Sequence, residues 1–128
     1  MTLVWVRLET VIALQAELLV QHGGLSGLRD RGALESALQR PQNLVLYEGV
    51  EDHSTLAAAY LVGVAKAHAF ADANKRTAWT TAALFLELNG TSLDYEPAAA
   101  LRMVVGAAES SLDLKGVTDW VRSHSRAR

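Results

Sequence analysis

Apolar residues recur at spacings of three and four along most of this chain, which is the repeat of a helix with one buried face. The first such stripe contains Val11, Leu14 and Leu18, and Gly23-Gly24 follows it. The pattern therefore predicts a first helix over about residues 9–21, ended by the two glycines. No part of the sequence has the alternating pattern that would predict the strands of a large sheet.

A second helix is predicted between two strong boundary residues. Asp30 can cap its start, and Pro41 predicts its end at about Arg40, because proline lacks the backbone N–H that a helix interior needs. Residues 43–53 carry mixed signals, and both a short helix and a flap-like hairpin fit them.

The second half of the chain predicts four more helices. Ser54 is a good N-cap for a helix that reaches about Ala67, and the next helix begins near Asn74 and stops at Asn89-Gly90. Residues 91–95 are expected to form a connector that is at most briefly extended. The last two helices are expected over about residues 96–109, with Pro97 in the first turn, and around Leu114, Val117, Trp120 and Val121.

The helices expected over residues 54–67 and 74–89 are apolar on nearly every side. A helix of this kind is buried by its neighbours, so these two are predicted to form the centre of the molecule. The expected fold is all-α: a compact, single-domain bundle of about six helices over residues 1–128. Its two central helices flank the loop that joins them.

Composition narrows the possible functions. The 128 residues include 12 Lys and Arg against 14 Asp and Glu, a formal net charge of −2, which lacks the basic excess of a domain that coats nucleic acid. The absence of cysteine excludes disulfides and thiolate metal sites, and fits the reducing cytoplasm. The start does not read as a secretory leader, and no uncharged run approaches the roughly 20 residues that span a bilayer. We therefore expect a cytoplasmic protein without direct contact to membrane or nucleic acid.

The polar chemistry gathers at the joint of the two apolar helices. Lys66, His68, Asp72 and Asn74-Lys75-Arg76 lie within eleven residues, between long uncharged stretches. Charged groups are normally scattered over a surface, and placing them at a core joint costs desolvation free energy. Their concentration at this point therefore indicates a functional site, with Lys66 as a possible accessory group.

The expected geometry of this joint suits a phosphorylated ligand. The helix that begins near Asn74 presents unpaired backbone N–H groups, and a helix N-terminus binds anions. Lys75 and Arg76 add positive charge at an end that is already positive, a conflict that a bound polyanion would relieve. Asp72 offers a hard oxygen ligand for Mg²⁺ that is shared with phosphates, and His68 can take up a proton near neutral pH.

Each of these residues also has a purely structural interpretation. Asp72 taken alone is better explained as a helix cap, and Lys75 and Arg76 taken alone would most often be a solvated surface. His68 could cap a helix end, and Phe70 is expected to be a core plug that anchors the loop. The combination of these residues, rather than any one of them, favours a functional site.

The segment His68-Ala-Phe-Ala-Asp-Ala-Asn-Lys-Arg76 resembles the signature of the Fic/Doc family, H-x-F-x-[DE]-[AG]-N-[GK]-R, at every fixed position. Gly23-Gly24-Leu25, the later Asp30 and Tyr60-Leu61-Val62 also resemble the Doc, or death-on-curing, toxins of this family. The resemblance extends over most of the chain.

The resemblance implies a role for each matched residue. His68 would be the general base on a target hydroxyl, and Asp72 would hold Mg²⁺ through the nucleotide phosphates. Asn74, Lys75 and Arg76 would bind phosphate oxygens of ATP, and Phe70 would anchor the loop. Residues 43–53 would fall where the family carries its target-docking flap.

Lys75 distinguishes two branches of the family. Most Fic proteins have glycine at this position and transfer AMP from ATP to a protein hydroxyl. The resemblance to Doc, which has lysine, implies a serine/threonine protein kinase that transfers the γ-phosphate, with translation elongation factor Tu as its implied target. AMP transfer, and a catalytically silent helical module that only binds a partner, remain the alternatives.

The resemblance also bears on control of the activity. The family uses an inhibitory helix with the pattern [ST]-x-x-x-E-[GN], and the nearest match here, Ser92-x-x-x-Glu96, is followed by Pro97. Since proline breaks the pattern, no built-in inhibitor is expected. The implied partner is a separate antitoxin chain, as in the Phd–Doc arrangement.

Overall fold

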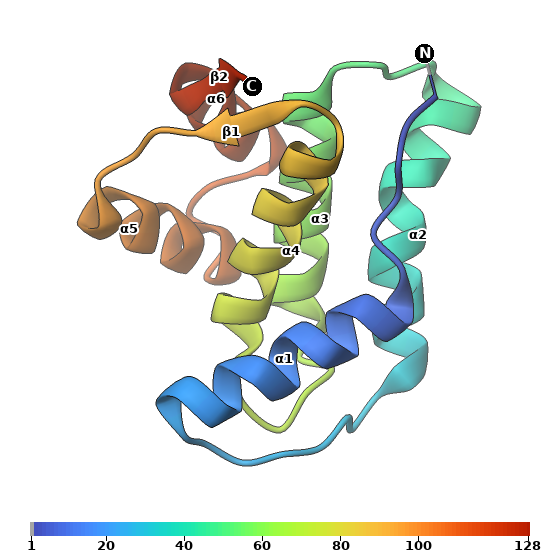
Figure 1. The fold of residues 1–128 in the computed structure, drawn as a ribbon. Helices are drawn as coiled ribbons and strands as arrows, with labels where there is room; N and C mark the ends of the chain where they lie inside the picture. Colours follow the sequence, from blue (N-terminus) through green and yellow to red (C-terminus); the bar gives the residue numbers. More distant parts are fainter. Residues whose placement is uncertain (1) are drawn as a thin grey trace.

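The computed structural model describes residues 2–128, which form six helices and two short strands (Figure 1). This confirms the predicted all-α class and the number of helices. Along that part of the chain, no helix combines the length and apolarity needed to cross a membrane. The elements are α1 (Leu8–His22), α2 (Arg31–Glu48), α3 (His53–Ala67), α4 (Asn74–Leu88), β1 (Thr91–Leu93), α5 (Pro97–Ala108), α6 (Leu114–His124) and β2 (Ser125–Ala127).

α3 is the most buried element, and α4 packs along it (Figure 1). An unbroken run of α3, residues 56–62, is buried, because α2, α4, α5 and α6 all contact this helix. α4 buries the face that carries Ala78, Ala82 and Phe85, while α1 and α5 cover part of its remaining surface. The prediction that these two helices form the centre is therefore confirmed.

The predicted end of the second helix at Arg40 is wrong. α2 continues through Pro41 to Glu48 and ends at Gly49, whose φ of 65° is left-handed. Proline inside a helix costs about 3 kcal/mol or more. Pro41 is itself buried on an apolar stripe that faces α3, and this burial offsets the cost. The stripe consists of Leu34, Ala37, Leu38, Pro41 and Leu44.

α2 and α3 pack closely at one point. A Cβ atom on Gly63 of α3 would lie 3.3 Å from the Cβ atom and the carbonyl oxygen of Ala37. Two small residues therefore meet where α2 and α3 approach each other closely. The continuous helix also shows that residues 43–53 do not form the flap-like hairpin that was one of the two alternatives. Their first six residues complete α2 and the rest lead into α3.

Residues 43–53 do not lie over the predicted site, which is a second correction. They precede the N-terminus of α3, whereas His68 follows its C-terminus, and α3 has 15 residues. At 1.5 Å per residue this separation is roughly 22 Å. Figure 1 shows the two regions at opposite ends of the bundle, so residues 43–53 cannot act as a flap on this loop.

Asp52, rather than the predicted Ser54, caps α3. The Asp52 carboxylate accepts hydrogen bonds from the Ser54 backbone N–H and the Thr55 hydroxyl, and it pairs with Arg122 of α6. Partial burial raises the pKa of Asp52, but the hydrogen bonds from Thr55, Arg122 and Ser54 outweigh it and hold this pKa below its usual value. Ser54 is buried one residue inside the helix.

Asp52→Ala is expected to lower the free energy of unfolding by about 1–2 kcal/mol at neutral pH, through loss of the cap. Urea unfolding followed by circular dichroism measures this. Because the folded pKa is lowered, the contribution is present above the unfolded pKa of about 3.9 and is lost as the pH falls through the folded value.

Asp94→Ala is the matched control, because Asp94 forms an exposed pair with Arg126 and does not cap a helix. Exposed ion pairs contribute about 0–1 kcal/mol. Equal destabilisation by the two variants, or an effect of Asp52→Ala that persists at pH 2, would contradict the capping role.

The chain end folds back on the connector between α4 and α5. β1 pairs with β2 in antiparallel register, with Ser92 opposite Arg126. The brief extended stretch allowed at residues 91–95 is therefore present, but its partner strand was not predicted. A three-residue strand carries too little sequence pattern to be recognised alone.

Candidate active site

The loop between α3 and α4, residues 68–73, has a left-handed residue at each end. His68 ends α3 with φ 47° and ψ 39°, and Ala73 precedes α4 with φ 62° and ψ 26°. Residues with a side chain avoid this region, at a cost of order 1–3 kcal/mol each. Strain of this kind persists only where surrounding contacts impose it, and it is concentrated at functional sites.

Asn74 imposes part of this loop conformation. Its side-chain oxygen accepts a hydrogen bond from the Phe70 backbone N–H at 3.1 Å, and its side-chain nitrogen donates to the Phe70 carbonyl at 3.0 Å. Phe70 is 3% exposed and belongs to the core, as an anchor requires. The structure thus shows Asn74 bracing the loop, whereas its predicted contact with phosphate remains a prediction.

The segment between α1 and α2 supports the loop from the other side (Figure 1). Leu28 forms an antiparallel β-bridge with Phe70, and the Ala71 N–H donates to the Gly27 carbonyl at 2.9 Å. The backbone N–H groups of Arg29 and Asp30 both donate to the Ala69 carbonyl. The sequence did not predict this pairing, because the bonds join segments about 40 residues apart.

α1 adds a buried contact that the sequence also did not reveal. The Gln15 side chain, 4% exposed, donates a hydrogen bond to the Asp72 carbonyl at 3.2 Å. A polar residue in the apolar stripe of a helix is a signal that could have suggested such a buried contact. The loop is therefore held by α1, by α4 and by the segment between α1 and α2.

Asp72 does not cap α4. Its carboxylate accepts hydrogen bonds from the Ala73 backbone N–H at 2.9 Å and from the Leu25 backbone N–H at 3.3 Å. These two bonds, with a smaller effect of Arg76, lower the pKa of Asp72. The carboxylate is therefore ionised at neutral and mildly acidic pH, and its side chain remains exposed.

The loop and the start of α4 line a cleft of about 350 Å³, called here the loop cleft. It brings together five of the predicted site residues: His68, Asp72, Asn74, Lys75 and Arg76. Leu101 and Ala108 of α5 form part of the opposite wall. The remaining prediction, Lys66, gains no support, since its exposed side chain lies on the last turn of α3 and does not line the cleft.

The N-terminus of α4 makes this cleft electropositive. The first helical hydrogen bond runs from Thr77 N–H to the Ala73 carbonyl, so the three preceding amides have no acceptor within the helix. Lys75 and Arg76 are exposed, and neither takes part in any ion pair that residues 2–128 form. Unpaired cations beside a helix N-terminus provide a site for a polyanion.

The donor set suits Mg²⁺ that arrives with phosphate rather than a metal held by protein alone. Within the described residues, no three His, Cys, Asp or Glu side chains are placed to hold a metal ion together. Asp72 supplies one exposed, ionised carboxylate in the lining of the loop cleft. Mg²⁺ is commonly bound by one or two carboxylates together with substrate phosphates and water, so this residue fits the predicted role.

Gly24 leaves the space that Asp72 occupies, and this provides a prediction. A Cβ atom at Gly24 would lie 2.8 Å from the Asp72 Oδ2 atom. Gly24→Ala is therefore expected to displace the carboxylate and to weaken Mg²⁺ binding in the presence of ATP by about tenfold or more. Calorimetric titration of Mg²⁺ at a fixed ATP concentration measures this.

Gly27→Ala controls for backbone strain. Gly24 and Gly27 have φ values of 125° and 129°, but a Cβ atom at Gly27 would meet nothing within 4 Å. Both variants are expected to lose stability, and only Gly24→Ala should lose Mg²⁺ affinity. Equal Mg²⁺ affinities in the two variants would show that the position of Asp72 is not set at Gly24.

Comparisons with known proteins agree with this geometry. A family model described as the Fic/DOC family matches residues 5–86, which include α1 to α3, the loop and all but the last two residues of α4. The protein kinase doc of Escherichia phage P1 is 40% identical over 114 residues, 89% of this chain and 90% of that protein. The toxin Doc of Mycolicibacterium smegmatis is 40% identical over 101 residues, 73% of this chain and 76% of that protein. The chain therefore belongs to the Fic/Doc family.

Proposed function

We propose that this protein is a Doc-type toxin that phosphorylates a serine or threonine hydroxyl of a target protein with the γ-phosphate of ATP. The observation that carries the proposal is the loop cleft. It places one imidazole and one ionised carboxylate beside two unpaired cations and a helix N-terminus. The names of the two relatives, a protein kinase and a toxin, support the same function.

In the proposed reaction, the target hydroxyl oxygen forms a bond to the γ-phosphorus while the bond from that phosphorus to the bridging oxygen breaks. The hydroxyl proton passes to the imidazole of His68, and ADP leaves. His68 suits this role because it is exposed in the cleft and its imidazole is the side chain that most often serves as a general base. The left-handed backbone conformation of His68, at the C-terminal end of α3, sets the direction in which its side chain leaves the backbone.

The start of α4 supplies the electrostatic part of the reaction. Its free amides, with Lys75 and Arg76, are positioned to stabilise negative charge on the transferred phosphoryl group. Arg76 can bind phosphate oxygens in a bidentate manner, and Lys75 acts as a point charge. When bound at Asp72, Mg²⁺ would neutralise charge on the nucleotide phosphates.

The rest of the proposal concerns partners. The implied target is elongation factor Tu, so the activity would arrest translation in the cytoplasm. The implied regulator is a separate, Phd-like antitoxin chain. Pro97 begins α5 and Ser92 lies in β1, so the nearest match to an inhibitory helix is not helical in this structure. This supports control by a separate antitoxin rather than by that segment.

The test is incubation of the purified protein with a bacterial lysate, Mg²⁺ and ATP that is labelled at either the γ- or the α-phosphate. The proposal expects one predominant protein band labelled from γ-labelled ATP and no band labelled from α-labelled ATP. Label from the α-phosphate would instead indicate transfer of AMP. The absence of both labels, together with no binding of ATP, would indicate a non-catalytic module.

A further inference from the structure

Gln15 is the polar side chain that α1 buries. It lies one turn after the buried Val11, and it is 4% exposed. Its side-chain nitrogen donates a hydrogen bond to the Asp72 carbonyl at 3.2 Å, across 57 positions of the sequence. Burial of an amide costs desolvation free energy that an apolar residue at the same position would not cost. The position therefore needs a reason beyond the packing of α1, and the contact with Asp72 provides one.

The carbonyl that Gln15 binds belongs to the peptide unit between Asp72 and Ala73. A trans peptide unit is planar, and its C=O and N–H groups point in opposite directions. On the opposite edge of this unit, the Ala73 N–H donates to one oxygen of the Asp72 carboxylate at 2.9 Å. The Leu25 N–H donates to the other oxygen at the longer distance of 3.3 Å. The bond from Gln15 therefore fixes the peptide plane, and the peptide plane fixes the carboxylate.

The same peptide unit adjoins a strained residue. Ala73 has a φ of 62°, in the left-handed region that residues with a side chain avoid. A flip of the peptide plane would change the φ of Ala73 by about half a turn and take it out of this region. The flip would also turn the Ala73 N–H away from the Asp72 carboxylate, and it would break the bond to Gln15. Strain at Ala73 thus favours the flipped state, and the bond from Gln15 opposes it.

We propose that Gln15 is a positioning residue for the Mg²⁺ and phosphate site: it holds the peptide between Asp72 and Ala73, and so keeps the Asp72 carboxylate where it can ligate the metal. This inference rests on the proposed function, in which Asp72 is the Mg²⁺ ligand. Gln15 does not line the loop cleft, so it acts on the site through this peptide. Partners that orient a metal ligand in this way contribute about 10–100-fold to metal affinity.

Gln15→Met tests the role of the hydrogen bond, because methionine has a similar length and no N–H to donate. Calorimetric titration of Mg²⁺ at a fixed ATP concentration should give a Kd about tenfold higher than that of the parent protein. Gln15→His should keep an affinity close to that of the parent, because a ring N–H of histidine can donate to the same carbonyl. An equal loss in both variants would show that the shape of glutamine matters rather than its donor, and the inference would be wrong.

Ala73→Gly tests the role of the backbone strain. Glycine adopts left-handed φ values without a steric cost, so relief of strain no longer favours the flip in this background. The Kd for Mg²⁺ of the double variant Gln15→Met/Ala73→Gly should therefore lie within about threefold of that of Ala73→Gly alone. A tenfold loss that persists in the glycine background would show that strain at Ala73 does not drive the loss, and it would overturn the inference.

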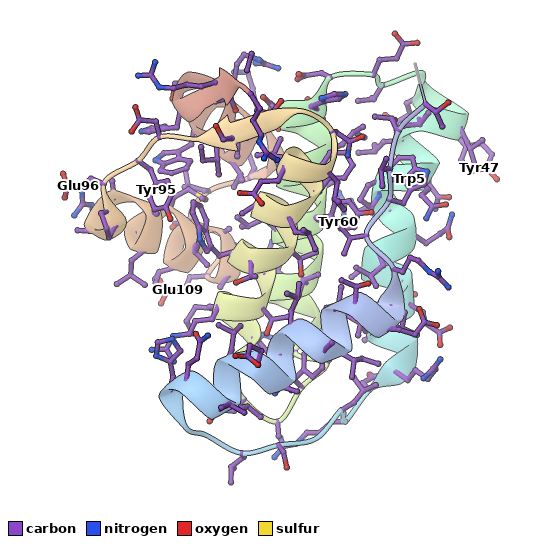
Figure 2. All side chains as sticks on the ribbon, viewed as in Figure 1. Trp5, Tyr47, Tyr60, Tyr95, Glu96 and Glu109 are labelled. Carbon is purple, nitrogen blue, oxygen red and sulfur yellow. The ribbon has the colours of Figure 1, made fainter. Side chains whose placement is uncertain are left out.

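Tyr60→Phe is the matched control for the loss of one buried hydrogen bond. The buried Tyr60 hydroxyl accepts a hydrogen bond from the Val6 N–H at 3.0 Å, on the side of α3 that faces the N-terminal segment (Figure 2). Tyr60→Phe and Gln15→Met should both lower the thermal unfolding midpoint. Only Gln15→Met should raise the Kd for Mg²⁺, and equal Mg²⁺ affinities of these two variants would contradict the positioning role.

A measurement without metal or nucleotide separates this inference from the proposed function. Amide hydrogen exchange followed by NMR reports the bond from the Ala73 N–H to the Asp72 carboxylate in the free protein. Gln15→Met should accelerate exchange at Ala73 beyond any change seen in Tyr60→Phe, and unchanged exchange would show that Gln15 does not hold this peptide. If the parent protein binds no Mg²⁺ in the presence of ATP, the proposed function itself fails, even where exchange at Ala73 changes as expected.

Discussion

Replacement of His68 by alanine is expected to slow phosphoryl transfer by about 10²–10⁴-fold, the usual contribution of a general base. His68 is exposed at the C-terminal end of α3 and lies outside the buried core. Folding and ATP binding should therefore remain nearly unchanged. Transfer from γ-labelled ATP, a calorimetric ATP titration and the thermal unfolding midpoint measure the three quantities separately.

His68→Asn separates the imidazole from the backbone. His68 has a φ of 47°, and asparagine adopts the left-handed region more readily than alanine does. If the imidazole accepts the proton, the two variants should lose activity equally, because neither replacement carries a base. Activity that survives in His68→Asn and is lost in His68→Ala would show that the loop conformation, rather than the imidazole, is required.

The sequence predicted the helices well where each one buries a continuous stripe, and it failed where distant contacts overrule a local signal. Pro41 is a strong local stop, but α3 buries it together with Leu34 and Leu44. The burial of that stripe cannot be predicted from the local sequence, because it depends on which helix packs against it. The predicted start of α3 was wrong for a different reason. Asp52 and Ser54 are both good N-cap residues, and only the structure shows that Asp52 accepts the hydrogen bond from a backbone N–H of the first turn.

The predicted site residues were found because they are contiguous in the chain, and five of the predicted residues meet in one cleft. The supporting contacts were missed because they come from elsewhere. Gln15 and the backbone of residues 25–30 hold the loop from the α1 side. Their contribution depends on how α1 packs against α4, and no local pattern encodes that contact.

Lys75 provides the second prediction of large effect, because this residue distinguishes the two branches of the family. It is the second residue of α4, is exposed, and lines the loop cleft. Lys75→Gly removes a point charge and a four-carbon stem from the cleft in which the ATP phosphates are proposed to bind. Phosphorylation of the target is therefore expected to be strongly weakened or absent.

Lys66→Gly is the matched control for Lys75→Gly. Lys66 is also exposed and helical, but it lies on α3 outside the loop cleft, so each variant loses one positive charge and gains one helical glycine. The glycine costs up to about 1 kcal/mol of helix stability.

We expect Lys66→Gly to retain phosphorylation, measured by mass spectrometry of the target after incubation with ATP. The parent protein should add a phosphoryl group of about 80 Da. Equal activity of the two variants would show that Lys75 does not bind the ATP phosphates. An adenylyl adduct from the parent protein would contradict the kinase assignment, while the loop cleft would remain the proposed site of reaction.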